Sequence, residues 1–169
     1  MRSRRRQGRA DRRKAIALRL PGLLCRLRKI VLVTDLKAFR RVCYMAARRT
    51  GGEVVEFRIS NEPTPNFHQA VIAYRDRTVA VACVRSTPIL AVALPRVIEF
   101  TPARECSPLT FVDVPDLAAA LADASDFRLL STAELDGPAD TMTWPWINER
   151  DMRYWQPHSL GEALFNYRD

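Results

Sequence analysis

Glycine is scarce in this 169-residue chain, which contains only six glycines. Neither the Gly-x-Gly-x-x-Gly motif of dinucleotide-binding folds nor a phosphate-binding P-loop occurs, so nothing in the sequence indicates nucleotide chemistry. The four cysteines lie 18 or more residues apart and form no Cys-x-x-Cys or Cys/His cluster of the kind that binds structural zinc. We therefore expect no metal site and no cofactor. The cysteines are Cys25, Cys43, Cys83 and Cys106.

A long apolar run is also missing. A membrane-spanning helix needs about 20 consecutive apolar residues, and no such run occurs in the sequence. Near the N-terminus, Arg19, Arg26 and Arg28 interrupt the apolar stretch that a secretory signal requires. Without a secretory signal or paired cysteines, the sequence predicts a cytoplasmic protein with free thiols and no membrane span.

The formal net charge of +8 is distributed unevenly along the chain. Residues 1–29 contain 12 Lys and Arg against one acid, whereas the other 140 residues contain 15 Lys and Arg against 18 acids. The acid excess is strongest from Leu109 onward, where 11 acids face four arginines. We therefore expect the folded part to bind a basic protein rather than an acidic one.

Residues 1–31 form an arginine-rich arm that we expect to lie outside the folded domain. Three interpretations of the arm stay open: a disordered arm that binds nucleic-acid phosphates, a basic amphipathic helix on a surface, or translated sequence upstream of the true start. The third follows from codon usage, because only three of the 27 basic residues are lysine. GC-rich genes show that bias and often start at a valine codon, here Val33. The arm arginines that would contact nucleic acid are Arg2, Arg4, Arg5, Arg6, Arg9, Arg12 and Arg13.

The predicted domain, residues 32–169, opens with a helix over residues 35–50. Thr34 or Asp35 can serve as its N-cap, and Gly51 with Gly52 supplies the left-handed stop. Its apolar positions recur at steps of three and four residues. They are Leu36, Phe39, Cys43 and Ala46, and the opposite side carries Arg40, Arg41, Arg48 and Arg49.

After this helix the apolar period changes to two, which is typical of strands. Val55, Phe57 and Ile59 form the predicted buried face of the first strand. Further strands are predicted over residues 70–74, 78–84 and 89–94, with 97–100 as a candidate fifth. The connections between these later runs are short, and short connections join antiparallel neighbours. The sheet is therefore predicted to be a meander.

The C-terminal part carries helix signals. Asp113 is the predicted cap of a helix with Pro115 in its first turn, residues 127–130 fit a short strand, and capping boxes begin at Ser131 and Ser159. The predicted fold class is therefore α+β: an N-terminal helix, a four- to five-stranded antiparallel meander, and short C-terminal helices packed on one face of the sheet.

Residues 144–167 contain all three tryptophans and six of the 14 aromatic residues. Exposed aromatic side chains rimmed by acids would anchor a basic partner. Alternatively, the same side chains dock short helices on the sheet, because aromatic residues bury the most area. Both interpretations stay open. The candidate partner-binding residues are Asp140, Trp144, Trp146, Glu149, Asp151 and Tyr154.

Cysteine and histidine on or beside the strands suggest a nucleophile–base pair such as Cys83 with His68. Cys83 shares a strand face with Val79 and Val81, so we expect a buried and inert thiol. An enzyme with its site near residues 61–68 stays an alternative.

Several short motifs close the chain: Trp144-Pro145, Arg150-Asp151, Tyr154-Trp155, Pro157, Gly161-Glu162 and Phe165-Asn166-Tyr167. These last 25 residues resemble the C-terminus of a group of small uncharacterised proteins from GC-rich bacteria, and the resemblance implies no activity. The predicted order of a helix, a meander and C-terminal helices also resembles the architecture of secretion chaperones and some toxin-immunity proteins, which is analogy of fold alone.

The sequence hypothesis is a non-enzymatic, immunity- or chaperone-like binding protein that uses an acidic aromatic C-terminal surface. The alternatives are a nucleic-acid accessory protein acting through the arm and the enzyme described above.

Overall fold

The computed structural model describes most of the predicted domain. The described residues are 34–61, 64–96, 108–123, 126–140, 143–144, 147 and 149–167. They all belong to one compact unit that spans Val31–Asp169. The predicted arm with its seven candidate arginines, the candidate strand over 97–100, Trp146, Cys25 and Cys106 lie outside the described residues.

Helix α1, Leu36–Arg49, begins and ends where its sequence predicts. The Asp35 carboxylate accepts hydrogen bonds from the backbone N–H groups of Lys37 at 2.8 Å and Ala38 at 3.3 Å, which satisfies two donors of the first turn. Gly51 follows the helix with φ of +73°, a conformation that glycine adopts without strain. The predicted helix over residues 35–50 is confirmed.

Five strands form one sheet in the order β1-β2-β3-β4-β5. The first four pair antiparallel, so the predicted meander is confirmed. The short strand predicted over residues 127–130 is β5, which pairs parallel to β4 after the chain has passed through a helix. The strands are β1 Glu53–Arg58, β2 Phe67–Ala73, β3 Thr78–Val84, β4 Ile89–Ala93 and β5 Arg128–Leu129.

Strand β1 departs from the predicted alternation. Its pairing with β2 shifts between Val54 and Glu56, where a β-bulge makes Val55 the extra residue. Val55 is 55% exposed, and Val54 and Phe57 pack toward the core under α1 instead. The prediction that Val55 shares a buried face with Phe57 and Ile59 is therefore wrong. A bulge adds one residue to one strand and so reverses the alternation beyond it.

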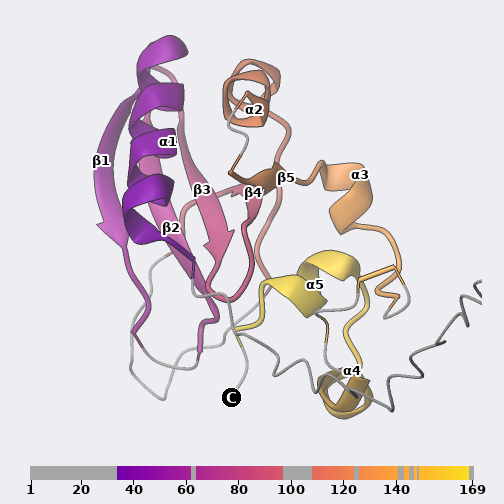
Figure 1. Cartoon of the computed structure of the whole chain (residues 1–169). Coiled ribbons are helices and arrows are strands. Elements are labelled where there is room, and N and C mark those ends of the chain that lie inside the picture. The colour runs from indigo at the N-terminus through magenta and orange to yellow at the C-terminus, as the bar shows by residue number, and fades with distance from the viewer. Residues whose placement is uncertain are drawn as a thin grey trace, which may run out of the picture. The chain divides into compact units, whose positions relative to one another are not determined.

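The sheet carries a hydrophobic core on each face. One core joins the strands to α1 and to α2, Pro115–Ala122. The other lies under α3, Thr132–Leu135, and α5, Leu160–Leu164. Successive strand residues point to opposite faces, so β3 and β4 are buried on both sides. Figure 1 shows α1 over strands β1 to β3 and the C-terminal helices grouped on the side of β5. This arrangement confirms the α+β class.

Two local features hold the C-terminal helices α3 and α5 in place. Ser131 and Glu134 form the predicted capping box of α3, with each side chain bonded to the other residue's backbone N–H. Gly161 lets α5 approach the sheet, because a Cβ there would overlap the Phe111 ring.

Asp113, in contrast, does not cap α2. The N-cap is Val114, and the Asp113 carboxylate accepts a 2.6 Å hydrogen bond from the Thr132 hydroxyl, so that prediction is wrong.

Helix α4, Glu149–Trp155, is the remaining element, and only Met152 reaches the second core. Among the described helices, none combines the length and apolar character that a bilayer crossing requires.

Candidate partner-binding surface

Helix α4 is the most accessible part of the predicted C-terminal surface, because none of its residues is buried. Tyr154 is 74% exposed. Its ring stands edge-on to that of Trp155, with 4.6 Å between the centroids. Trp155 is half-buried and so limits the orientations open to the tyrosine. The helix thus presents one large aromatic side chain in a restrained position.

The charges on α4 are mixed rather than uniformly acidic. Glu149 pairs with Arg153 one turn later, with 3.8 Å between nitrogen and oxygen. Asp151 is exposed and forms no ion pair among the described residues. Asp140, which precedes the helix, accepts a 2.7 Å hydrogen bond from the Thr143 hydroxyl. Of the predicted carboxylates, Asp151 is therefore the one best placed to meet a cation from a partner.

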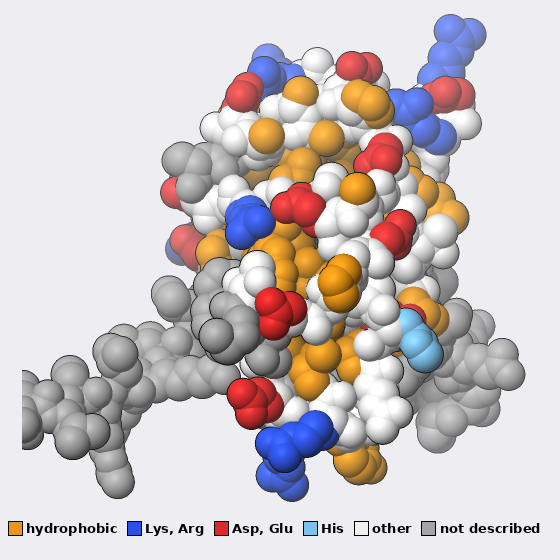
Figure 2. Space-filling view, turned by 90° about the vertical axis from the view of Figure 1, so that its right-hand side faces the viewer, with side chains coloured by type: hydrophobic (Ala, Val, Ile, Leu, Met, Phe, Trp, Pro, Cys, Tyr) orange, Lys and Arg blue, Asp and Glu red, His pale blue; other side chains and the backbone are white. Residues whose placement is uncertain are grey.

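Carboxylates dominate the wider surface around α4. Figure 2 shows this side of the molecule, where acidic side chains are spread from top to bottom and basic groups are fewer. Exposed carboxylates also lie on and beside α2 and α3, and they add to the negative charge of the C-terminal half of the domain. They are Asp113, Asp116, Asp136 and Glu134.

Trp144 does not belong to the accessible surface. It is 6% exposed and packs in the second core, with the Arg128 guanidinium 4.5 Å from its ring centroid. Arg128 also pairs with Glu134 at 3.2 Å, so Trp144 is covered by an ion pair. This position fits the alternative interpretation, in which an aromatic residue docks the C-terminal segment on the sheet. Trp146 lies outside the described residues.

His68 and Cys83 lie directly opposite each other on β2 and β3. His68 is 3% exposed and Cys83 is fully buried. Burial, aided by the charge of Arg85, lowers the pKa of His68 to about 4, and burial raises the pKa of Cys83 to about 12. Both groups are neutral at pH 7, whereas a cysteine nucleophile requires a thiolate. The prediction of a buried thiol is confirmed.

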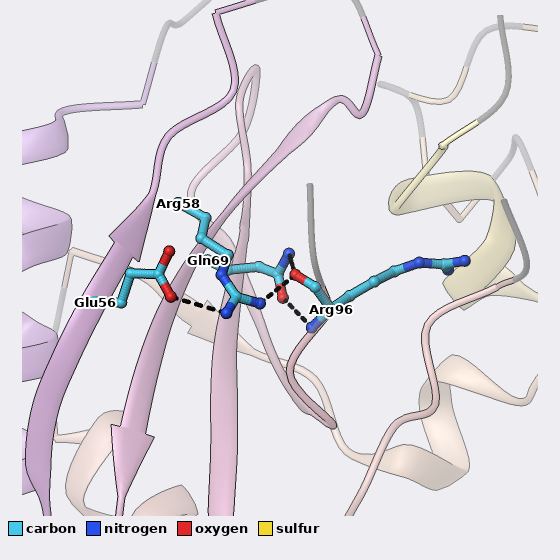
Figure 3. Close-up of polar contacts among 4 residues, drawn as sticks. All are labelled: Glu56, Arg58, Gln69 and Arg96. Atoms are coloured by element: carbon cyan, nitrogen blue, oxygen red, sulfur yellow. Dashed lines mark hydrogen bonds and ion pairs between the residues drawn. The ribbon is translucent and has the colours of Figure 1, made fainter. Parts of the chain in front are cut away.

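A polar cluster around the buried Gln69 joins β1 and β2 to the segment after β4 (Figure 3). Gln69 is fully buried, and its amide exchanges two 3.0 Å hydrogen bonds with the backbone N–H and C=O of Arg96. Arg58 donates to the same carbonyl oxygen and, at 2.8 Å, to the carboxylate of Glu56. The Arg58 hydrogen bond holds the pKa of Glu56 below its ordinary value. These polar groups bind one another, so the cluster is structural.

The sequence did not indicate this cluster, although Gln69 and the neighbouring His68 are polar residues in a mostly apolar strand β2. A polar residue in a strand that is buried on both faces is the signal that could have revealed it. Within the described ranges, no group of three or more His, Cys, Asp or Glu side chains could hold a metal ion.

Comparison with known proteins gives no family. No family model, no curated protein and no solved structure matches the chain. The resemblance of the last 25 residues to small proteins of GC-rich bacteria stays a prediction. Function must therefore be argued from the chemistry of the described surfaces.

Proposed function

We propose that the domain is a non-enzymatic binding protein, immunity- or chaperone-like, which holds a basic protein partner on the surface of α4. The observation that carries the proposal is Tyr154. It is a large aromatic side chain, 74% exposed, on a helix that contributes no buried residue. Tyrosine is one of the residue types that most often supply the binding energy of protein interfaces.

The neighbours of Tyr154 favour binding. Its contact with Trp155 restrains the ring before a partner arrives, so less side-chain entropy is lost on binding. Asp151, on the same helix, can form a charge-assisted hydrogen bond with a lysine or arginine of the partner. The hot spot of the proposed interface therefore combines one aromatic ring with one carboxylate.

Long-range electrostatics favours a partner of positive charge. The 11 acids against four arginines after residue 108 give this half of the domain a negative field. Such a field accelerates the encounter with a basic protein and disfavours acidic ones. The attraction should weaken as salt is added, because the carboxylates are exposed.

Photo-crosslinking tests the proposal directly. A photoreactive phenylalanine analogue replaces Tyr154 in the full chain, and a matched control carries it at Asp76 in the exposed turn between β2 and β3. We expect a basic protein to be crosslinked from position 154 alone. A second variant reverses the charges of Asp140, Glu149 and Asp151, and it should capture less of the same protein. Crosslinking of the same proteins from both positions, or capture unchanged by charge reversal, contradicts the proposal.

A further inference from the structure

The outward side of α1 carries a second group of exposed apolar side chains. Tyr44 is 56% exposed and Met45 is 40% exposed. The Tyr44 ring stands edge-on to the Phe57 ring of β1, with 5.4 Å between the centroids. We call Arg40, Tyr44, Met45, Arg48 and Phe57 together the α1 surface. It lies on the opposite face of the sheet from the core that α4 contacts.

Positive charge borders these apolar side chains. Arg40, Tyr44 and Arg48 follow one another at intervals of four residues, so they form a row along the helix. The Arg40 guanidinium lies 5.3 Å from the Phe57 ring centroid. Helix α1 contains five cationic residues and no acid between its first and last residue. Along this row, the aromatic ring of Tyr44 therefore lies between the guanidinium groups of Arg40 and Arg48.

The arginines of α1 differ in how far their charge is compensated. Arg49 pairs with Asp123 at 2.7 Å, and Arg41 pairs with Asp126 at 3.1 Å. Arg48 has no ion-pair partner in the described part of the chain, and Arg40 contacts only an aromatic ring there. The uncompensated charge is therefore concentrated on the row that contains Tyr44.

A shallow hollow of about 450 Å³ lies beside this row. Tyr44 and Met45 give it an apolar lining, and Arg48 and Arg49 give it a cationic rim. The hollow is open to solvent, so a group bound there would stay partly exposed. An apolar side chain flanked by carboxylates would match both parts of the hollow.

We propose that the α1 surface binds an acidic polypeptide segment. An apolar side chain of that segment enters the hollow, and its carboxylates pair with Arg40 and Arg48. Guanidinium groups suit this role because they bind carboxylates through two parallel hydrogen bonds. This site goes beyond the proposed function, since it lies on another helix and recognises the opposite charge.

The described contacts favour a polypeptide over a nucleic acid. Uncompensated arginines bind carboxylates as well as phosphates, so charge alone does not separate the two ligands. Met45 is 40% exposed beside the arginine row and offers aliphatic contact area, which a peptide side chain uses better than a sugar–phosphate chain does. A second copy docking its own acidic side here would make a heterologous contact, which builds a ring or a filament rather than a two-fold dimer.

Fluorescence anisotropy on the full chain tests the site. The probe is a labelled peptide of about 12 residues that alternates Asp and Glu with Leu and Phe. The Arg40→Glu/Arg48→Glu variant should bind it at least about tenfold more weakly than the original chain. The matched control is Arg75→Glu/Arg77→Glu in the exposed turn between β2 and β3, which changes the net charge equally and should bind within about twofold. Tyr44→Ala should weaken binding without changing the net charge.

Other outcomes overturn the proposal. Equal weakening by the two charge-reversed variants would show that only net charge matters. Binding of an oligothymidylate of about 20 nucleotides that is lost specifically in the Arg40→Glu/Arg48→Glu variant, without peptide binding, would assign the surface to nucleic acid. Concentration-dependent oligomers in sedimentation velocity that the same variant abolishes, again without peptide binding, would assign it to a second copy.

Discussion

Helices α1 and α4 both present a tyrosine to solvent, but the fold holds them in different ways. Helix α1 has 14 residues, a carboxylate N-cap and six buried residues. Helix α4 has seven residues, none of them buried. On α1, the proposed binding residues can therefore be changed without touching the residues that fix the helix. On α4, the position of Tyr154 depends on its neighbours, and in particular on its contact with Trp155.

The largest expected effect is on the free energy of unfolding, and it distinguishes a buried residue of α1 from an exposed residue of α4. Phe39 is fully buried and makes edge contacts with Phe57 at 6.0 Å and Phe127 at 6.5 Å between centroids. Phe39→Ala should lower the free energy of unfolding by about 3–5 kcal/mol. Tyr154→Ala should change it by less than about 0.5 kcal/mol. Urea unfolding followed by circular dichroism measures the free energy of unfolding of both variants. Similar losses in the two variants would contradict the view that the fold holds α1 and α4 differently.

The next effect is the pH dependence that His68 gives to the core on the α1 side. Its pKa is about 4 in the folded chain and about 6.5 when unfolded, so the unfolded chain binds the proton more tightly. The free energy of unfolding should keep its full value above pH 6.5. It should fall by up to about 3 kcal/mol as the pH drops to 4. Glu56 and Glu134 also titrate at low pH, so the comparison with His68→Gln isolates the histidine. If that variant loses stability as steeply as the original chain between pH 6.5 and 4.5, His68 is not the cause.

Gln69 tests how the segment after β4 is held. Gln69→Ala removes both bonds to the Arg96 backbone and leaves a small cavity, which should cost about 2–3 kcal/mol. Thr78→Ala at the exposed start of β3 is the control and should be nearly neutral. Hydrogen exchange at the Arg96 amide should speed up in the Gln69 variant alone. Unchanged exchange at that amide would argue against the two-bond contact.

The smallest expected effect concerns the cap of α3, which supports the C-terminal side. Ser131→Ala removes the acceptor for the Glu134 backbone N–H and should cost about 1 kcal/mol. The loss should also loosen the Arg128–Glu134 pair that covers Trp144. Thermal unfolding combined with tryptophan fluorescence checks both. A red-shifted emission without loss of the fold is the expected signature, and an unaltered spectrum contradicts it.

Local chemistry explains which parts of the fold could be predicted. The limits of α1 followed from Asp35 and Gly51, because a cap and a left-handed residue act within one turn. The bulge at Val55 could not be predicted, since it exists only in the pairing of β1 with β2. The partner of Gln69 is Arg96, 27 residues away, so the strand sequence alone does not contain that contact.

The candidate surface shows the same limit. Trp144 and Tyr154 look alike as aromatic residues among acids, and both were candidate anchors. Trp144 is buried because it packs in the second core, with Arg128 of β5 over its ring. Tyr154 is exposed because α4 touches the core only through Met152. Composition indicated that aromatic residues gather here, but long-range docking decides which of them a partner can reach.

The parallel pairing of β4 with β5 has a consequence for the order of folding. Hairpin partners in the meander are close in sequence, whereas Leu90 and Leu129 meet only after a long loop has closed. Contacts of high sequence separation form slowly, because the entropy of loop closure opposes them. We therefore expect the meander to form first and the acidic side with α3, α4 and α5 to dock afterwards. A nascent chain would then form the proposed partner surface only in the last step, which completes the domain.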